Sequence, residues 1–148
     1  MSLLPRKALL AIAAVVDVAL NGRDRPVSAK ALATRHALPP RHLEPVLQAL
    51  VHEGILRGVR GPHGGYALAR EPGQIGIDEI VRAAATVRDH DDEDAIASPL
   101  IAEVVSPAVA EAERAFSGAL SRINVDDLAR RVEADGRRAD AADIDFTI

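Results

Sequence analysis

The feature that most constrains this fold is a change of hydrophobic spacing at Gly54. Before that glycine, apolar residues recur every three or four positions in three successive stretches. After it, residues 55–60 and 66–69 form two short apolar or alternating runs around the glycine-rich segment 61–65. Helical spacing predicts helices, and two short runs around a glycine-rich tip predict a β-hairpin. The expected order is therefore helix, helix, turn, helix, hairpin.

The first two helices are predicted over residues 5–21 and from Ser28 to Arg35. Asn21-Gly22 supplies the first stop, and the Ser28 hydroxyl can cap the free amides of the second helix. The second helix is expected to turn Ala31 and Leu32 inward. The expected core face of the first helix consists of Leu9, Ile12, Ala13, Val16 and Leu20.

After a turn over residues 36–39, a third helix is predicted from Pro40 to Glu53. Proline is tolerated in a first turn, and the expected buried stripe consists of Leu43, Val46, Leu47 and Leu50. Pro45 removes an amide donor, and we expect a distorted first turn with the lost bond among the initially unpaired donors. A fourth helix is predicted over residues 77–85, with Ile77, Ile80 and Val81 buried.

Beyond Thr86 the composition changes. Residues 89–94 contain five acids, one histidine and no apolar residue, which is typical of a solvated loop. Ser106-Pro107 opens or kinks a long helix that runs to about Ile123, and Asn124 caps a last short helix over residues 125–132. The long helix has a nearly heptad-spaced apolar face rich in alanine. That face packs on the first part of the chain or pairs with another copy.

The element order is that of a winged helix-turn-helix with a long helix appended. The expected fold is thus mainly α with a small β-hairpin. It comprises a winged helix-turn-helix DNA-binding domain over residues 1–85, an acidic linker over 86–98, dimerisation helices over 99–135 and a mobile tail over 136–148.

Composition excludes several classes of protein. The 148 residues include no cysteine, so disulfides, thiolate zinc sites, cysteine-ligated iron–sulfur clusters and thiol nucleophiles are excluded. The longest apolar stretch, residues 8–16, is about half the roughly 20 residues of a membrane span. No signal peptide is recognisable at the amino terminus. We expect a cytoplasmic protein with no membrane partner.

The net charge of −4 hides a division of the chain into two parts. Residues 1–88 contain 12 Lys and Arg against 7 Asp and Glu, a net of +5, whereas residues 89–148 contain 6 against 15, a net of −9. A basic first part favours polyanion binding there. Two oppositely charged solvated faces would give the same counts.

The first turn of the third helix is expected to expose Arg41, His42 and Glu44. In helix-turn-helix proteins this turn enters the major groove, where arginine can donate to guanine and glutamate can accept from cytosine. An ordinary surface pair between Arg41 and Glu44 is the alternative. Arg60, near the hairpin tip, could reach a minor groove. Candidates for phosphate contacts, which position a protein on DNA without reading its sequence, are Arg6, Lys7, Lys30, Arg35 and Arg57. His63 completes the predicted DNA-binding set.

Other chemistries find little support in the sequence. Segment 61–65 lacks the Lys-Ser/Thr ending of a phosphate-binding loop and does not lead into a helix. His90, among aspartates, could hold a divalent cation weakly, but a solvated loop is the simpler interpretation. No carboxylate pair or nucleophile arrangement stands out. We therefore predict no enzyme activity, catalytic residue, metal site or cofactor.

Several strings resemble the Rrf2 family of winged-helix transcription regulators. They are Asp17 to Leu20, Leu43-Glu44, Gly54 to Leu56, Val59 to Ala69, Ile77 to Ala83 and Ile123 to Leu128. The similarity is close over residues 3–85, and it implies a homodimer with crossing long helices on a roughly palindromic operator. By position it implies that Glu44 reads a base, that Arg60 is the wing arginine and that Lys7 lies near the DNA backbone.

The sequence also departs from this family. Members that carry an iron–sulfur cluster place three cysteines around residues 86–98, and this chain has none, so cluster sensing is not carried over. Pro39, Arg41 and His42 also differ from the common residues, which implies a different operator.

The predicted function is a sequence-specific regulator of double-stranded DNA, a homodimeric repressor without a cluster. The expected dimer seam consists of Val109, Ala112, Phe116, Leu120 and Ile123. An unidentified small-molecule effector is expected to act through the linker and the long helix. The alternative is a winged-helix protein-interaction module whose basic face binds an acidic partner. An enzyme would require a pocket with titratable residues.

Overall fold

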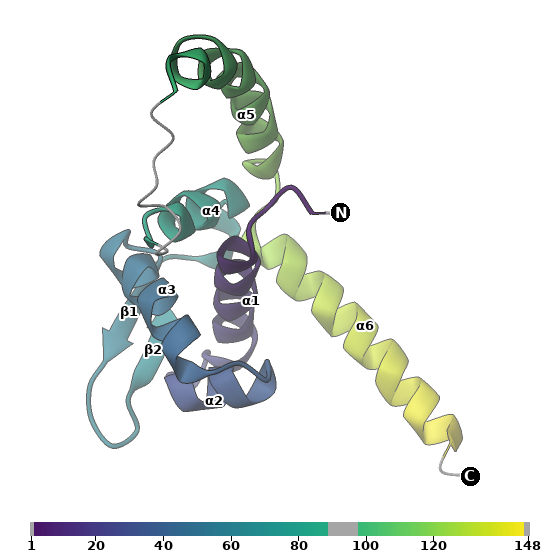
Figure 1. Cartoon of the computed structure of the whole chain (residues 1–148). Coiled ribbons are helices and arrows are strands. Elements are labelled where there is room, and N and C mark those ends of the chain that lie inside the picture. Colours follow the sequence, from purple (N-terminus) through teal and green to yellow (C-terminus); the bar gives the residue numbers. More distant parts are fainter. Residues whose placement is uncertain (1, 89–97, 147–148) are drawn as a thin grey trace.

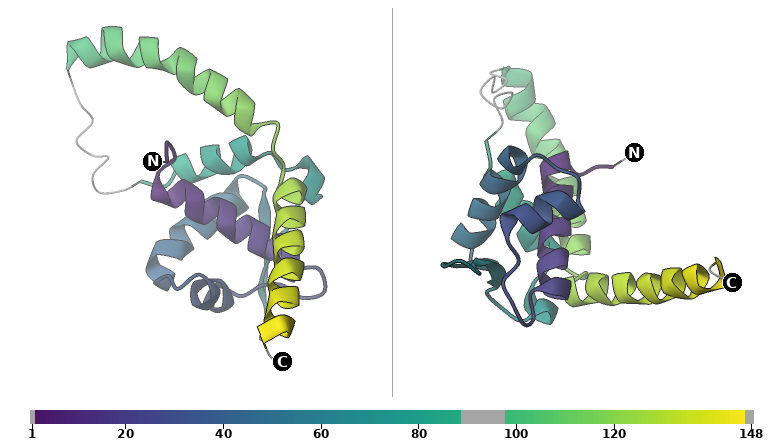
Figure 2. Two further views of the ribbon diagram at one scale, coloured as in Figure 1. Left: turned by 90° about the vertical axis from the view of Figure 1, so that its right-hand side faces the viewer. Right: turned by 90° about the horizontal axis from the view of Figure 1, so that it is seen from below.

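The computed structural model describes residues 2–88 and 98–146, with side chains described up to residue 136. The main elements are α1 (Arg6–Asn21), α2 (Ala29–Arg35), α3 (Pro40–His52), β1 (Leu56–Val59), β2 (Gly65–Leu68), α4 (Ile77–Ala85), α5 (Ser106–Leu120) and α6 (Val125–Phe146). Helices α1 to α4 and the hairpin lie together, whereas α5 and the far end of α6 project from them (Figures 1 and 2). The expectation of a mainly α fold with a small hairpin is confirmed.

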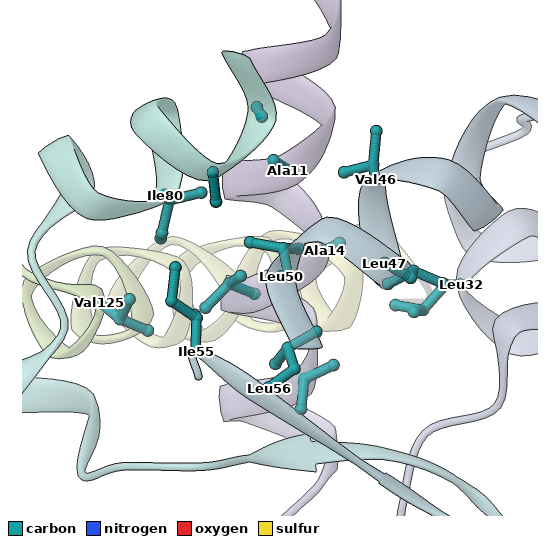
Figure 3. Packing of buried hydrophobic residues seen from close by; sticks show 14 of the residues in the cluster. Ala11, Ala14, Leu32, Val46, Leu47, Leu50, Ile55, Leu56, Ile80 and Val125 are labelled. Atoms are coloured by element: carbon teal, nitrogen blue, oxygen red, sulfur yellow. The ribbon is translucent and has the colours of Figure 1, made fainter. Parts of the chain in front are cut away.

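Helix α1 is the central element, in contact with α3, α4, α6 and β2. Its buried side is lined by small residues such as Ala8, Ala11 and Ala14, which let neighbouring helices approach closely (Figure 3). The predicted core face was therefore partly wrong. Leu9 is 45% exposed, whereas Val16 is buried as predicted. A helix apolar on most sides does not reveal from spacing alone which side its neighbours cover.

The two helices that follow α1 begin as predicted. The Ser28 hydroxyl accepts a hydrogen bond from the Ala31 amide at 3.0 Å and caps α2. Helix α3 begins at Pro40, and its buried residues are the predicted Leu43, Val46, Leu47 and Leu50. The prediction for Pro45 was wrong. Pro45 is the sixth residue of a continuous α-helix, beyond the first free donors, so the bond it removes is an internal one to the Arg41 carbonyl.

The hairpin pairs Leu56 with Leu68 at one end and Val59 with Gly65 at the other. Strand β1 is shorter than predicted, β2 begins and ends one residue earlier than predicted, and the loop before α2 adds a third element beside the hairpin. The Val27 amide donates to the Tyr66 carbonyl and the Tyr66 amide to the Val27 carbonyl, both at 2.8 Å. This bridge fixes the hairpin to the helix-turn-helix.

The carboxy-terminal half differs from the prediction in its helix boundaries. Residues 89–97, most of the expected acidic linker, lie outside the described residues. The chain is helical from residue 99, and a π-helical turn, η3 (Ile101–Val105), leads into α5. Ser106-Pro107 therefore lies inside a helix and does not open it. Pro107 cannot donate to the carbonyl four residues earlier, and a wider turn accommodates that loss.

Helix α6 is longer than predicted, because it continues past residue 132 to Phe146 and includes most of the expected tail over 136–148. The prediction that Asn124 caps it is confirmed. The Asn124 Oδ1 accepts from the Asp127 amide at 2.9 Å, and the Asp127 Oδ2 accepts from the Asn124 amide at 3.0 Å. Such reciprocal bonds satisfy two free donors at a helix start.

The start of α6 is joined to the first domain. The Ile77 amide donates to the Ile123 carbonyl at 2.9 Å, and the Val125 amide donates to the Ile75 carbonyl at 3.0 Å. The Val125 side chain has no exposed surface and belongs to the same core as α1, α3 and α4 (Figure 3). Among the helices of the described residues, none has both the length and the apolar character needed to span a membrane.

Candidate nucleic-acid interface

The solvent face of α3 carries the residues that were predicted to read DNA. Arg41, His42 and Glu44 are all exposed on the first turns of the helix. The opposite face is held in the core by Leu43, Val46, Leu47 and Leu50, each at most 1% exposed. The helix is therefore fixed in rotation about its axis, and its polar face stays turned to solvent.

Gln48 lies one turn beyond Glu44 and is exposed as well. Residues spaced by three, four and seven positions share one helix face. Arg41, Glu44 and Gln48 therefore form one polar row, and glutamine is a residue that can pair with adenine. The sequence analysis missed Gln48, although its spacing from Glu44 could have identified it.

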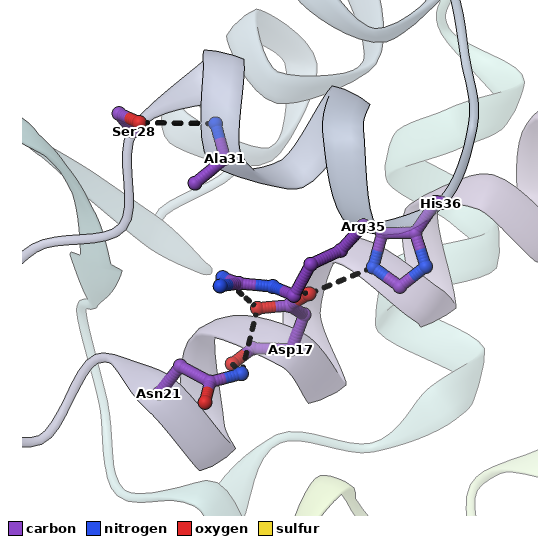
Figure 4. A network of polar contacts seen from close by, with 6 residues as sticks. All are labelled: Asp17, Asn21, Ser28, Ala31, Arg35 and His36. Carbon is purple, nitrogen blue, oxygen red and sulfur yellow. Dashed lines mark hydrogen bonds and ion pairs between the residues drawn. The ribbon is translucent and has the colours of Figure 1, made fainter.

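A buried carboxylate fixes α2 against α1 (Figure 4). The Asp17 side chain is 4% exposed and accepts hydrogen bonds from the Arg35 Nε at 2.9 Å and the Arg35 Nη2 at 2.7 Å. The His36 Nε2 lies 2.8 Å from its Oδ2, and the Asn21 Nδ2 donates to its Oδ1 at 3.0 Å. Ala37, directly after this cluster, has a φ of 51°, and the chain there turns toward α3.

This cluster changes the interpretation of Arg35, which was predicted to contact phosphate. Its guanidinium is engaged by Asp17 in a bidentate pair, because a carboxylate inside the core needs a compensating charge. Burial alone would raise the pKa of Asp17, but the hydrogen bonds from Arg35, Asn21 and His36 outweigh it and lower that pKa. The pair with Asp17 raises the pKa of Arg35. An acid inside an otherwise apolar helix was the sequence signal for this cluster.

We call the hairpin (residues 56–68) the wing. Glycines shape its tip. Gly61 has a φ of 119°, which favours glycine. A Cβ on Gly64 would lie 2.2 Å from the Val59 carbonyl oxygen, so no larger residue fits there without a backbone shift. Arg60 and His63 are exposed at this tip.

The wing tip lies beside the start of α2. A hollow of about 310 Å³ is lined by Pro62, His63 and Gly64 on one side and by Arg25, Ser28 and Arg35 on the other. The structure thus brings together His63 and Arg35 from the predicted set. It adds Arg25, which the sequence analysis missed because a charged loop carries no periodic signal.

The other predicted cations lie at different places. Lys30 is exposed on α2 and borders a hollow formed with the turn before α3. The Lys7 Nζ donates to the Val87 carbonyl at 2.7 Å, and Lys7 borders the same hollow as Arg41 and His42. Arg57 is exposed on β1 and lines a separate hollow with Arg23 and Arg70. The described lining of that hollow contains no residue of α3.

The predicted dimer seam is divided by the structure. Leu120 and Ile123 are partly buried against the chain's own core. Val109 and Ala112 are exposed, Phe116 is half-buried, and no residue of α5 is fully buried. Apolar side chains continue this exposed surface toward the preceding turn, at Leu100, Val104 and Val105, which are 63%, 58% and 43% exposed.

A protein family model matches most of this chain. The family model for Rrf2, described as iron-dependent transcriptional regulator, matches residues 4–131. This chain belongs to the Rrf2 family of transcriptional regulators. The match includes the winged helix-turn-helix and continues through α5 into α6.

Curated relatives match about half of the chain. The HTH-type transcriptional regulator IscR of Cronobacter sakazakii is 36% identical over 80 residues, which are 54% of this chain and 49% of that protein. IscR of Klebsiella pneumoniae is 35% identical over the same shares. The chain thus matches about half the length of these curated Rrf2 relatives.

Solved structures share the fold over most of the chain. T. potens IscR superposes with a TM-score of 0.69 at 26% identity and covers 89% of each chain. CymR of B. subtilis, described as the global cysteine regulator, gives 0.65 at 22% identity over 88% of this chain and 98% of its own. These matches confirm the winged-helix fold of this Rrf2 protein.

The iron named in the family description does not fit the side chains of this member. The whole sequence contains no cysteine, so no thiolate is available to an iron–sulfur cluster. Within residues 2–88 and 98–136, no group of three or more His, Asp or Glu side chains is placed to hold a metal ion. His90 and its neighbouring aspartates lie outside the described residues.

Proposed function

We propose that this Rrf2 protein binds double-stranded DNA sequence-specifically, as a homodimer on a roughly palindromic operator, and represses transcription there without an iron–sulfur cluster. The observation that carries the proposal is the fixed orientation of α3. Its buried stripe holds Arg41, His42 and Glu44 toward solvent at the end of the helix that enters the major groove in helix-turn-helix proteins.

Base reading is assigned to the polar row on α3. The Arg41 guanidinium can donate two hydrogen bonds to guanine, the Glu44 carboxylate can accept from the cytosine amino group, and Gln48 can pair with adenine. Glu44 repels phosphates, so it weakens non-specific binding and favours sites where a cytosine compensates it. Specificity is therefore expected to depend on Glu44 more than affinity does.

The wing and the surrounding cations supply contacts that position the protein. Arg60 and His63 project at the wing tip, where an arginine can enter a narrow minor groove. Lys7, Lys30 and Arg57 are proposed to contact phosphates, which adds affinity on all sequences. The net charge of +5 over residues 1–88 favours this role.

Dimerisation is assigned to the exposed apolar surface of α5 and the turn before it. Two copies crossing through this surface would cover Val104, Val105 and Val109, which are exposed in one chain. The two α3 helices could then enter successive major grooves about 34 Å apart. A dimer on a promoter blocks access to the DNA, which is why repression is proposed.

The test is selection of bound duplexes from random DNA by the purified protein, followed by binding titrations at several salt concentrations. Recovery of one inverted-repeat motif with half-sites about one helical turn apart supports the proposal. Recovery of unrelated duplexes with equal affinities would show that the basic face lacks sequence specificity. In that case the protein-interaction module becomes the better interpretation.

A further inference from the structure

We propose that the hollow between the starts of α1 and α3 and the end of α4 is a binding site for a small carboxylate with an apolar body. The hollow has a volume of about 780 Å³. Ligand pockets for small molecules commonly measure about 300–1,000 Å³. Residues from three separate helical segments contribute to it, so the tertiary fold creates it.

Basic side chains surround this hollow. Arg6 and Lys7 come from the first turn of α1, Arg41 and His42 from α3, and Arg88 from the segment after α4. No Asp or Glu is present in its described lining. Arg6, Arg41 and Arg88 bring three guanidinium groups to one opening, and a bound anion would offset the repulsion between them. The Lys7 ammonium is held at this site by its bond to the Val87 carbonyl.

Apolar side chains form the rest of the lining. They are Leu10, Pro45, Val46 and Val87. Val46 is 1% exposed and closes the hollow against the core. An inorganic anion would leave this surface in contact with water, whereas an alkyl or aryl body would cover it. Cations and apolar walls together therefore favour an amphipathic carboxylate.

Such a ligand would compete with DNA, and this part of the inference rests on the proposed function. Arg41 and His42 line the hollow and also belong to the proposed base-reading turn. A carboxylate that holds these side chains removes them from the groove. By linkage, ligand and operator then lower each other's affinity by the same factor.

The first experiment measures ligand binding without DNA, by calorimetry on the full chain with octanoate as the probe. Octanamide has the same body without the charge, and acetate has the charge without the body. Octanoate is expected to bind about tenfold or more tightly than either. Equal affinity for octanoate and octanamide, or for octanoate and acetate, would overturn the proposal.

The second experiment locates the site with Arg88→Gln, a residue to which the proposed function gives no role. Arg88 is exposed, so this variant is expected to fold as the parent does, and the thermal unfolding midpoint checks this. Octanoate affinity should fall about tenfold in Arg88→Gln. It should be unchanged in Arg114→Gln, which removes the same charge on α5. Equal loss in both variants would mean that octanoate responds only to net charge, and the site would be wrong.

The third experiment adds an operator duplex to these proteins. Octanoate should release the duplex from the parent protein but much less from Arg88→Gln. If octanoate does not bind and Arg88→Gln weakens the duplex instead, the hollow belongs to the DNA footprint and the inference fails while the proposed function stands. If octanoate binds but no duplex does, the carboxylate site stands and the proposed function fails.

Discussion

The Arg35 guanidinium holds the Asp17 carboxylate through two hydrogen bonds, Nε to Oδ2 at 2.9 Å and Nη2 to Oδ1 at 2.7 Å. Asp17 lies in the middle of α1 and Arg35 at the end of α2, so this pair fixes the orientation of the helix-turn-helix on the core. The next residues form the turn into α3. The orientation of the proposed base-reading helix thus depends on a contact that touches no DNA.

Substitution of Arg35 by Gln should destabilise the protein by about 2–3 kcal/mol, because it leaves a carboxylate in the core without its cation. We expect less than the full cost of breaking a buried ion pair, because the Arg35 side chain is 43% exposed. Urea denaturation measures the change. Arg23→Gln is the matched control, because its pair with Glu133 is 70% and 44% exposed and should contribute less than about 1 kcal/mol. Equal effects of the two substitutions would contradict this account.

The same carboxylate predicts a loss of stability in acid. Because the fold lowers the pKa of Asp17, the unfolded chain takes up this proton at a higher pH than the folded one. The stabilisation is therefore complete above the unfolded pKa of about 3.9 and is lost as the pH falls through the folded pKa. Urea titrations from neutral pH downward should show it.

The control for this acid effect is Asp17→Asn, which should flatten the decline below about pH 4. Part of the decline will persist, because the Gly76 amide and Arg70 lower the pKa of Glu79 despite its partial burial. Identical pH dependence of the parent and Asp17→Asn would show that Asp17 contributes nothing in this range.

Substitution of Gly64 by Ala should distort the wing. The new Cβ would lie 2.2 Å from the Val59 carbonyl oxygen, so the backbone must shift, at a cost of about 1–3 kcal/mol. Gly58→Ala is the matched control, since nothing lies within 4 Å of a Cβ there. We expect Gly64→Ala to lower both the melting temperature and the duplex affinity. Wild-type values for both would refute the role given to this turn.

On the proposed operator, Glu44→Ala should lose about 1–3 kcal/mol of binding and tolerate more bases at one position. Lys7→Ala should instead weaken all duplexes alike and reduce the salt slope by about 1. Anisotropy titrations on the selected site and on base-substituted sites separate the two effects. Glu53→Ala, an exposed acid at the other end of α3, is the control and should change neither. A uniform loss with Glu44→Ala would remove it from base reading.

Substitution of Phe116 by Asp should convert the proposed dimer to monomer. A charge in an apolar seam must be dehydrated when two copies associate, which disfavours the dimer. Sedimentation velocity measures the outcome. Arg114→Asp introduces the same group on another side of α5 and should remain dimeric. A dimeric Phe116→Asp protein would place the seam on another surface.

Local signals in the sequence predicted much of the fold. Ser28 and Asn124 marked two helix starts through side-chain caps, and Pro40 marked a third. The bounds of α4 agree with its prediction at both ends. These features depend on a few neighbouring residues, and the chain carries them directly.

Features that depend on the assembled fold were predicted less well. Spacing placed Leu9 in the core because α1 is apolar on several sides, and only its neighbours decide which side is covered. The role of Arg35 depends on Asp17, which lies 18 residues away in sequence. The hollow beside Arg41 joins α1, α3 and the end of α4, and no local pattern in the sequence could reveal it.

The enclosed position of Val125 has a consequence for how this protein is built. That side chain fills a socket in the amino-terminal domain although it follows the segment that carries the outward-facing helix α5. A fragment ending before it would expose the empty socket to water. The start of α6 therefore completes the core of the amino-terminal domain, and the backbone bonds of Ile77 and Val125 join it to α4 and to the segment just before α4.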